Sequence, residues 1–152
     1  MKAEQVNKAF VSAGLTLGSV ESFTGGLFAE TITSISGASK FYKGGYITYA
    51  TEEKINLIYV PKDAIDRFGV VSKEVAYHMA NNARHLLKTD VCVSFTGNAG
   101  PDAMEGKPVG EVHMCIATAN KAQVYSLQLE GTRKEIQLKA VEFILEKLLE
   151  LF

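Results

Sequence analysis

The spacing of apolar residues along this chain alternates between a helical pattern and the unbroken runs of buried strands. Residues 3–13 place their apolar side chains on one helical face, and Gly14 follows where a glycine commonly ends a helix. The apolar run Leu15–Val20 predicts a buried strand, and helical spacing returns over Thr24–Ser34. The chain is therefore expected to begin with a helix, a strand and a second helix.

The remainder of the chain continues this interleaving. Apolar runs predict further strands, the last two joined as a hairpin, at Gly45–Ala50, Asp90–Thr96, Gly110–Ala119 and Gln123–Leu129. Helical spacing and capping residues predict helices over Thr51–Tyr59, from Ser72 to about Leu87, and after Thr132. Because helices alternate with mostly buried strands, we expect an α/β fold. It would be a three-layer α/β/α sandwich with a mixed, mostly parallel sheet, in a single domain over residues 1–152.

Charge and composition exclude two classes of partner. Lys and Arg number 16 and Asp and Glu 17, which gives a formal net charge of −1 at pH 7. This balance offers no electrostatic footprint for nucleic acid or for an anionic membrane. No apolar run approaches the roughly 20 residues of a membrane helix, and the N-terminus lacks the apolar region of a signal peptide. Cys92 and Cys115 lie in strand-like runs, so we expect buried free thiols in a cytoplasmic protein.

The turn after the first predicted strand carries a candidate nucleophile. It reads Glu21-Ser22-Phe23-Thr24-Gly25-Gly26 and leads into a helical pattern. A helix start supplies backbone N–H donors and partial positive charge, and glycine lets a ligand approach the backbone closely. The functional interpretation places the Ser22 hydroxyl beside free N–H groups. The alternative is an ordinary strand-to-helix turn with a small-residue N-cap.

A serine nucleophile needs a base, and no histidine is placed to supply one. His78 and His85 are seven residues apart on one predicted helix, which does not suit a shared metal ion. Lys54, in the first turn of the helix after the second strand, is the candidate base, since desolvation and a helix N-terminus both lower a lysine pKa. Tyr49 ends that strand and could pass a proton or orient the serine. The alternative is a solvated Lys54 and an aromatic rim residue at Tyr49.

A second glycine-rich turn follows another buried strand. The sequence Thr96-Gly97-Asn98-Ala99-Gly100-Pro101 opens the one long irregular loop, residues 98–109. Sites in open α/β sheets collect at the carboxyl ends of strands. We therefore expect this turn and the Ser22 turn to face one crevice.

Five segments, in order along the chain, resemble one family. Glu21–Gly26 resembles the Glu-Ser-Cys-Thr-Gly-Gly signature of the CinA C-terminal domain family, the nicotinamide-nucleotide amidases (PncC-like). Gly44–Lys54 is similar to that family's Gly-Gly-x-x-x-Tyr-Ser-Asn-x-x-Lys segment. The other three similar segments are Gly69–Ser72, Thr96–Pro101 with Lys107–Gly110, and Gly131–Ile136, which begins the last helix.

The resemblance implies an activity and a set of site residues. The reaction would be hydrolysis of nicotinamide mononucleotide to nicotinic acid mononucleotide and ammonia, a salvage step toward NAD, without metal or cofactor. Ser22 would be the nucleophile, with Tyr49 and Lys54 as its activators. Candidates for binding the small nucleotide substrate, whose phosphate needs N–H donors or a cation, are Thr24, Gly25, Gly26, Thr96, Gly97, Ala99, Gly100 and Arg133. The resemblance is to the standalone type of member, and it leaves a homo-oligomer open.

Several positions depart from the family's pattern. Phe23 replaces a cysteine, Thr51 an asparagine, Asn98 an aliphatic residue and Gln137 an arginine, while Ser22, Tyr49 and Lys54 are intact. A second interpretation therefore stays open: a catalytically weak or inactive member that binds a nucleotide or a protein partner. Release of ammonia from nicotinamide mononucleotide separates the two.

Overall fold

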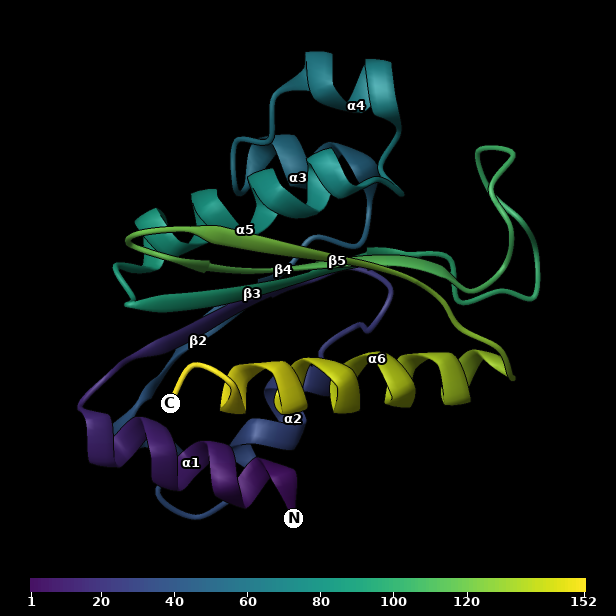
Figure 1. Ribbon diagram of the computed structural model, residues 1–152. Helices are drawn as coiled ribbons and strands as arrows, with labels where there is room; N and C mark the ends of the chain where they lie inside the picture. Colours follow the sequence, from purple (N-terminus) through teal and green to yellow (C-terminus); the bar gives the residue numbers. More distant parts are fainter.

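A five-stranded sheet lies between two groups of helices in the computed structural model, which describes residues 1–152 (Figure 1). The strand order is β2-β1-β3-β4-β5. β1 pairs in parallel with β2 and β3, and the pairs β3–β4 and β4–β5 are antiparallel. The sheet is mixed, as predicted, with its parallel part confined to three neighbouring strands. The strands are β1 (Leu17–Glu21), β2 (Tyr42–Ile47), β3 (Val91–Gly97), β4 (Glu111–Thr118) and β5 (Ala122–Gln128).

Helices cover both faces of the sheet, which confirms the predicted three-layer sandwich (Figure 1). One face carries α1 (Lys2–Ala13), α2 (Leu27–Thr33) and α6 (Arg133–Leu149), and the other carries α3 (Thr51–Asn56), α4 (Lys62–Phe68) and α5 (Lys73–Leu87). The predicted helix ends at Gly14 and Ser72 are confirmed. Gly14 has φ 69°, and the Ser72 hydroxyl accepts a hydrogen bond from the N–H of Val75 at 3.2 Å. Thr132 begins α6 with a capping box completed by Glu135.

Two local predictions were wrong in their boundaries, and one helix was missed. The second helix begins at Leu27, not at Thr24, because Gly25 and Gly26 have φ of 59° and 108°, which a right-handed helix does not allow. β2 ends at Ile47 because its ladder with β1 ends there, at the end of β1. The helix α4 was not expected, and only Ala64 of its residues is buried, so its apolar pattern is weak.

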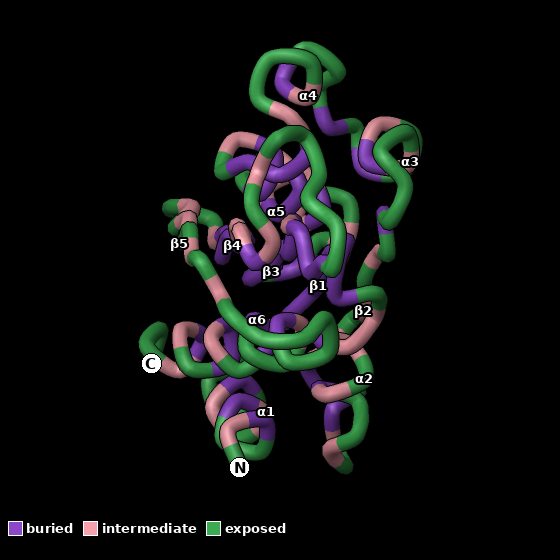
Figure 2. The backbone as a smooth tube through the Cα atoms, turned by 90° about the vertical axis from the view of Figure 1, so that its right-hand side faces the viewer, coloured by how far each residue is buried: buried purple, intermediate pink, exposed green.

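Two apolar layers hold the sandwich together. The larger lies between the sheet and the helices α1, α2 and α6, and includes the pair Phe28 and Phe95, whose ring centroids are 5.3 Å apart. The smaller layer lies under α5 and consists of two separate clusters. Figure 2 shows the buried segments concentrated along the sheet and the inward faces of the helices. Cys92 and Cys115 are buried free thiols, as expected, and burial raises the pKa of Cys115 to about 12.

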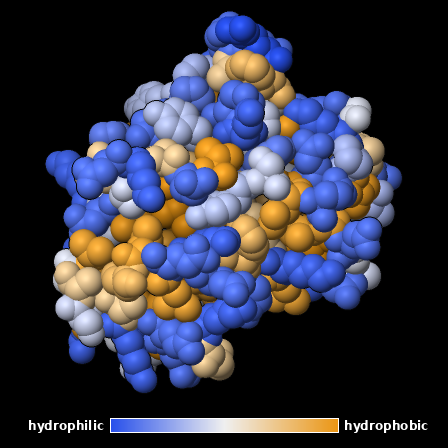
Figure 3. All heavy atoms as spheres, in the orientation of Figure 1, coloured by the Kyte–Doolittle hydropathy of each residue, from blue (hydrophilic) through white to orange (hydrophobic).

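The surface is mixed in character. On the face shown in Figure 3, apolar side chains gather in a band across the middle, and hydrophilic ones cover the very top, where α4 lies in Figure 1. None of the helices has the length and apolar character needed to span a lipid bilayer.

The topology places three chain segments at one edge of the sheet. The chain leaves β1 for β2 on one side, and β3 flanks β1 on the other side. The carboxyl ends of these three parallel strands meet at the edge that faces the viewer in Figure 2. Such a switch point is where open α/β sheets form a ligand crevice.

Candidate active site

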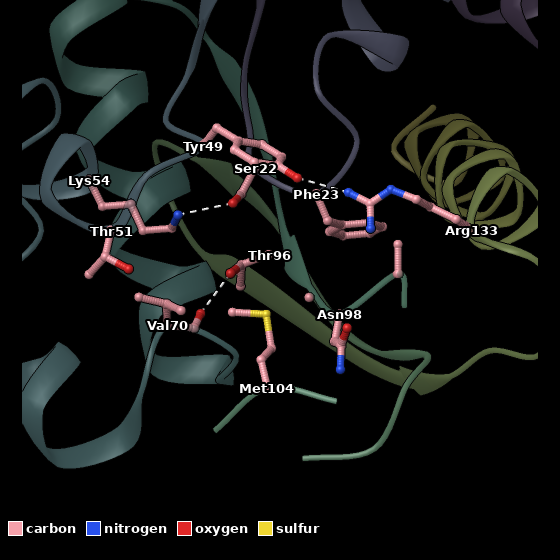
Figure 4. Close-up of a pocket in the computed structure, with 12 residues that line it drawn as sticks. Ser22, Phe23, Tyr49, Thr51, Lys54, Val70, Thr96, Asn98, Met104 and Arg133 are labelled. Carbon is pink, nitrogen blue, oxygen red and sulfur yellow. Dashed lines mark hydrogen bonds between the residues drawn. The ribbon is translucent and has the colours of Figure 1, made fainter. Parts of the chain in front are cut away.

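A pocket lies at this edge (Figure 4). Ser22 after β1 and Thr96 in β3 line the same pocket, as the expected shared crevice requires. Its walls are completed by residues from three other segments: the one that follows β2, the one that precedes α5 and the start of α6. The lining residues are Ser22, Phe23, Tyr49, Thr51, Lys54, Val70, Thr96, Gly97, Asn98, Ala99, Met104 and Arg133.

Ser22 and Lys54 are in direct contact. The Nζ of Lys54 donates to the Oγ of Ser22 at 2.9 Å and to the carbonyl oxygen of Thr48 at 2.7 Å. Lys54 is 1% exposed and Ser22 8% exposed, so the alternative of a solvated lysine is wrong. Both oxygens that the amine contacts belong to neutral groups. The lysine is thus buried without a carboxylate in contact with it.

Burial changes the acidity of this amine. It lowers the pKa of Lys54 from 10.5 to about 8, because the charged form loses its hydration. The negative charges of Glu105 and Glu52 raise this pKa, but less than burial lowers it. About a tenth of Lys54 is therefore neutral at pH 7, a fraction that rises with pH, and this neutral amine is able to accept the proton of Ser22.

Tyr49 lies apart from this pair. It is 60% exposed, and its hydroxyl accepts a hydrogen bond from Nη2 of Arg133 at 2.8 Å. Arg133 also donates through Nη1 to the carbonyl oxygen of Gly100. Figure 4 shows the Tyr49 and Arg133 side chains meeting on the side of the pocket away from Lys54. The structure therefore brings Tyr49 to the pocket rim, while Ser22 contacts Lys54 without a bridging residue.

Glu21 has a role that the sequence analysis missed. Its carboxylate is 1% exposed and accepts hydrogen bonds from the Thr24 hydroxyl at 2.7 Å and from the N–H groups of Phe28 at 2.9 Å and Ala29 at 3.1 Å. It thereby caps α2 and fixes the turn that carries Ser22. The signals in the sequence were an acidic residue at the end of a buried apolar run and its place at the start of the Glu21–Gly26 segment that resembles the family signature.

This cap also decides where ligand donors remain. The N–H groups at the start of α2 are taken by Glu21, and Thr24, Gly25 and Gly26 do not line the pocket. The N–H groups of Phe23 and Thr24, in contrast, have no acceptor within the protein. Free donors therefore follow Ser22 directly in the chain, at Phe23 and at Thr24, which the sequence analysis had named, whereas the N–H groups of Phe28 and Ala29 in α2 are taken by Glu21.

The second glycine-rich turn forms the opposite wall. The Thr96 hydroxyl donates to the carbonyl oxygen of Val70 at 2.6 Å, and Gly97 and Ala99 line the pocket. Gly100 lies behind the wall, where its N–H donates to Oδ1 of Asn98 at 3.1 Å. A Cβ at Gly97 would come within 2.9 Å of the Glu111 carbonyl oxygen, so the close packing of β3 on β4 requires a glycine here.

Three further residues near the pocket were not assigned a role by the sequence analysis, although Gln137 was noted there as a departure from the family pattern. Val70 and Met104 line it from the turn before α5 and from the long loop. Gln137 of α6 donates to the carbonyl oxygen of Phe23 at 2.8 Å and so braces the turn of the nucleophile. No group of three or more His, Cys, Asp or Glu side chains is arranged to hold a metal ion.

Comparison with known proteins places the chain in a family. The family model of the CinA C-terminal domain matches residues 1–152. The chain is 40% identical over 150 residues to a candidate competence-damage inducible protein of Bacillus subtilis (strain 168), covering 97% of this chain and 36% of that protein. It is 43% identical over 138 residues to a protein of the same name from Geobacillus sp. (strain WCH70), covering 88% and 33%. The chain thus spans about a third of the length of these curated relatives.

Solved structures agree with this placement. The competence/damage inducible protein CihA of Agrobacterium tumefaciens is 33% identical, with a TM-score of 0.95 and coverage of 99% of this chain and 93% of that one. The CinA superfamily protein ECK1530/EC0983 of Escherichia coli is 27% identical, also with a TM-score of 0.95, and the match covers 99% of this chain and 88% of that one. On sequence and structure together, this chain belongs to the CinA C-terminal domain family.

Proposed function

We propose that the protein is a serine amidase that converts nicotinamide mononucleotide to nicotinic acid mononucleotide and ammonia. The observation that carries this proposal is the buried contact of 2.9 Å between Lys54 Nζ and Ser22 Oγ. A neutral lysine in that position is a general base for a serine hydroxyl. The nicotinamide nucleotide as substrate is supported by the family resemblance.

The first half of the reaction forms an acyl-enzyme. Neutral Lys54 accepts the hydroxyl proton as the Oγ of Ser22 attacks the carboxamide carbon. The oxygen of the tetrahedral intermediate becomes negative, and the free N–H group of Phe23, which lines the pocket, is the donor for it. The intermediate collapses when the C–N bond breaks, and Lys54 returns the proton to the leaving nitrogen, which departs as ammonia.

The second half releases the acid. A water molecule attacks the ester carbonyl and gives its proton to Lys54. The bond between the acyl carbon and the Oγ of Ser22 then breaks, and Lys54 returns a proton to that oxygen. The carboxylic acid ionises in solution, so the enzyme ends in its starting state.

The charge of the pocket supports an anionic substrate. Lys54 and Arg133 are its two basic lining residues, and none of the lining residues is acidic. Arg133 uses two of its donor groups on Gly100 and Tyr49, and a guanidinium has five N–H donors. The remaining donors and the free N–H of Ala99 are available to a phosphate.

Loss of the nucleophile tests the reaction directly. Ser22→Ala should lower ammonia release from nicotinamide mononucleotide by roughly a thousandfold or more, because the covalent route is removed. Binding of the nucleotide, measured by calorimetry, should persist. Ser39→Ala, at an exposed serine, is the control and should retain full activity. Near-normal ammonia release by Ser22→Ala would exclude the mechanism, and binding without release by the unaltered protein would favour a binding-only member.

The pH profile and an arginine variant test the base. The value of kcat/KM should rise about tenfold per pH unit below pH 8 and level off above it, since only neutral Lys54 accepts a proton and its pKa is about 8. Lys54→Arg should be inactive at every pH, because a guanidinium stays charged. Lys62→Arg, at an exposed lysine, is the matched control. An active Lys54→Arg enzyme would show that position 54 supplies charge alone.

Stability offers an independent test of the buried amine. Lys54→Met should stabilise the fold by about 2 kcal/mol at pH 7, because the wild type holds a charge there without water. Unfolded lysine has a pKa near 10.4 and folded Lys54 about 8, so the wild type gains stability as pH rises between these values. The difference in the free energy of unfolding between Lys54→Met and the wild type should therefore become smaller from pH 8 to pH 10. Thermal unfolding at several pH values measures this difference. A Lys54→Met protein that is less stable than the wild type at pH 7 would contradict the prediction.

Arg133 separates phosphate binding from a structural role. Arg133→Ala should raise KM for nicotinamide mononucleotide about tenfold or more with little change in kcat, because a bidentate contact to phosphate is lost in ground and transition states alike. Nicotinamide riboside, which lacks the phosphate, should be affected much less. An equal loss for both compounds would mean that Arg133 acts by holding Tyr49 and Gly100.

A further inference from the structure

The long loop after β3 is fastened to the turn before α5. We call residues Pro101–Pro108 the strap. They form the exposed loop that crosses in front of α5 in Figure 2. The Glu105 carboxylate accepts hydrogen bonds from the N–H groups of Val70 at 3.0 Å and Val71 at 3.1 Å. Lys107 donates to the carbonyl oxygens of Phe68, at 2.8 Å, and Val71.

These contacts give the turn before α5 most of its hydrogen-bond partners. The Val70 carbonyl oxygen accepts from Thr96 at 2.6 Å, and the Val70 N–H is taken by Glu105. Val70 and Met104, one from the turn and one from the strap, both line the pocket of Ser22. The position of this wall therefore depends on side chains of the strap.

Glu105 occupies a backbone position that its own turn does not favour. The N–H of Lys107 donates to the Met104 carbonyl oxygen at 2.9 Å, and the two residues between them, Glu105 and Gly106, have φ of 56° and 69°. Turns of this kind favour Asn, Asp or Gly at both central positions, and a glutamate there is strained. Gly69 allows the carboxylate to approach, because a Cβ at Gly69 would lie 2.7 Å from Oε1 of Glu105.

We propose that Glu105 is a positioning residue of the active site, which fastens the strap over the pocket and sets the charge environment of Lys54. The first part of this proposal, that Glu105 fastens the strap, rests only on the hydrogen bonds described above. The effect on Lys54 rests on the proposed function, because it matters only if Lys54 is the base. Glu105 is the largest source of negative charge acting on Lys54, ahead of Glu52.

The ionisable groups around Lys54 come from four segments of the chain. They are Glu52 on α3, Tyr49 after β2, Arg133 on α6, and Glu105 with its neighbour Lys107 on the strap. Removing the negative charge of Glu105 leaves the protonated lysine less favoured. The acid limb of kcat/KM should then move to lower pH.

Three variants separate fastening from charge. Glu105→Gln removes the charge and one of the two acceptor oxygens, Glu105→Asp keeps the charge but shortens the reach, and Glu52→Gln removes a charge that makes no contact with the strap. Hydrogen–deuterium exchange at the amides of Val70 and Val71 reports the fastening. The pH profile of ammonia release reports the charge.

We expect faster exchange at Val70 and Val71 in both Glu105 variants and unchanged exchange in Glu52→Gln. The acid limb, the part of the pH profile where kcat/KM rises with pH, should move about half a pH unit lower in Glu105→Gln, as expected for the loss of a partly screened charge pair. It should move less in Glu52→Gln. It should stay in place in Glu105→Asp, which keeps the charge. Unchanged exchange in the Glu105 variants would overturn the fastening. An unmoved acid limb in Glu105→Gln would overturn the effect on Lys54. If the wild type releases no ammonia, the proposed function fails and the effect on Lys54 with it, while exchange still decides the fastening.

Discussion

The hydrogen bond between Lys54 and Ser22 is the interaction on which the site depends. The register between β1 and β2 brings the two residues within reach of each other. The two residues are 32 positions apart, and each follows a different strand. Parallel pairing puts Glu21 opposite Ile47, and the N–H of Thr48 continues the ladder to the Glu21 carbonyl oxygen at 2.9 Å. A slip of this register would move the lysine by a residue repeat of about 3.3 Å and break the contact.

Two buried ionisable side chains, Glu21 and Lys54, flank Ser22, and they differ in how well their hydrogen-bond partners stabilise the charged form. The Glu21 carboxylate receives three hydrogen bonds from its own turn and from α2, so its oxygens are well satisfied and the turn is rigid. The Lys54 amine receives only neutral oxygens as partners, which leaves its charged form unfavourable. The hydrogen-bonded carboxylate of Glu21 contributes to the stability of the fold. The buried amine of Lys54 lowers that stability, and buried groups of this kind are typical of functional sites. The apolar layers on both faces of the sheet are the source of stability that tolerates it.

Local patterns in the sequence were enough for the order of the elements apart from α4, and they named Ser22 and Lys54 as candidates. Capping residues and apolar runs located α1, α5, α6 and the β4–β5 hairpin, because those signals act within a few residues. Lys54 was found through its place at the start of a helix after a strand. The roles of Gln137 and Glu105 were not, because their partners lie 34 to 114 positions away and only the folded chain brings them together. The role of Glu21 was missed although its partners lie 3 to 8 positions away, because they meet it only through the turn at Gly25 and Gly26. The start of α2 was misplaced for a related reason: the glycines there adopt positive φ so that the turn can close on Glu21.

The pocket separates the Ser22–Lys54 pair in the interior from Tyr49 and Arg133 at its rim. Lys54 is 1% exposed and Tyr49 60% exposed, so the two residues that the family resemblance pairs as activators lie in different environments. The hydroxyl of Tyr49 is held by Arg133, the cation on that side of the pocket. An anion that reaches Arg133 therefore also reaches Tyr49, whereas the proton of Ser22 has a direct path to Lys54. The hydrogen bonds therefore link Tyr49 to the cation of the pocket and not to the Ser22–Lys54 pair. A protein of net charge −1 presents a basic pocket by keeping acidic side chains out of the pocket lining.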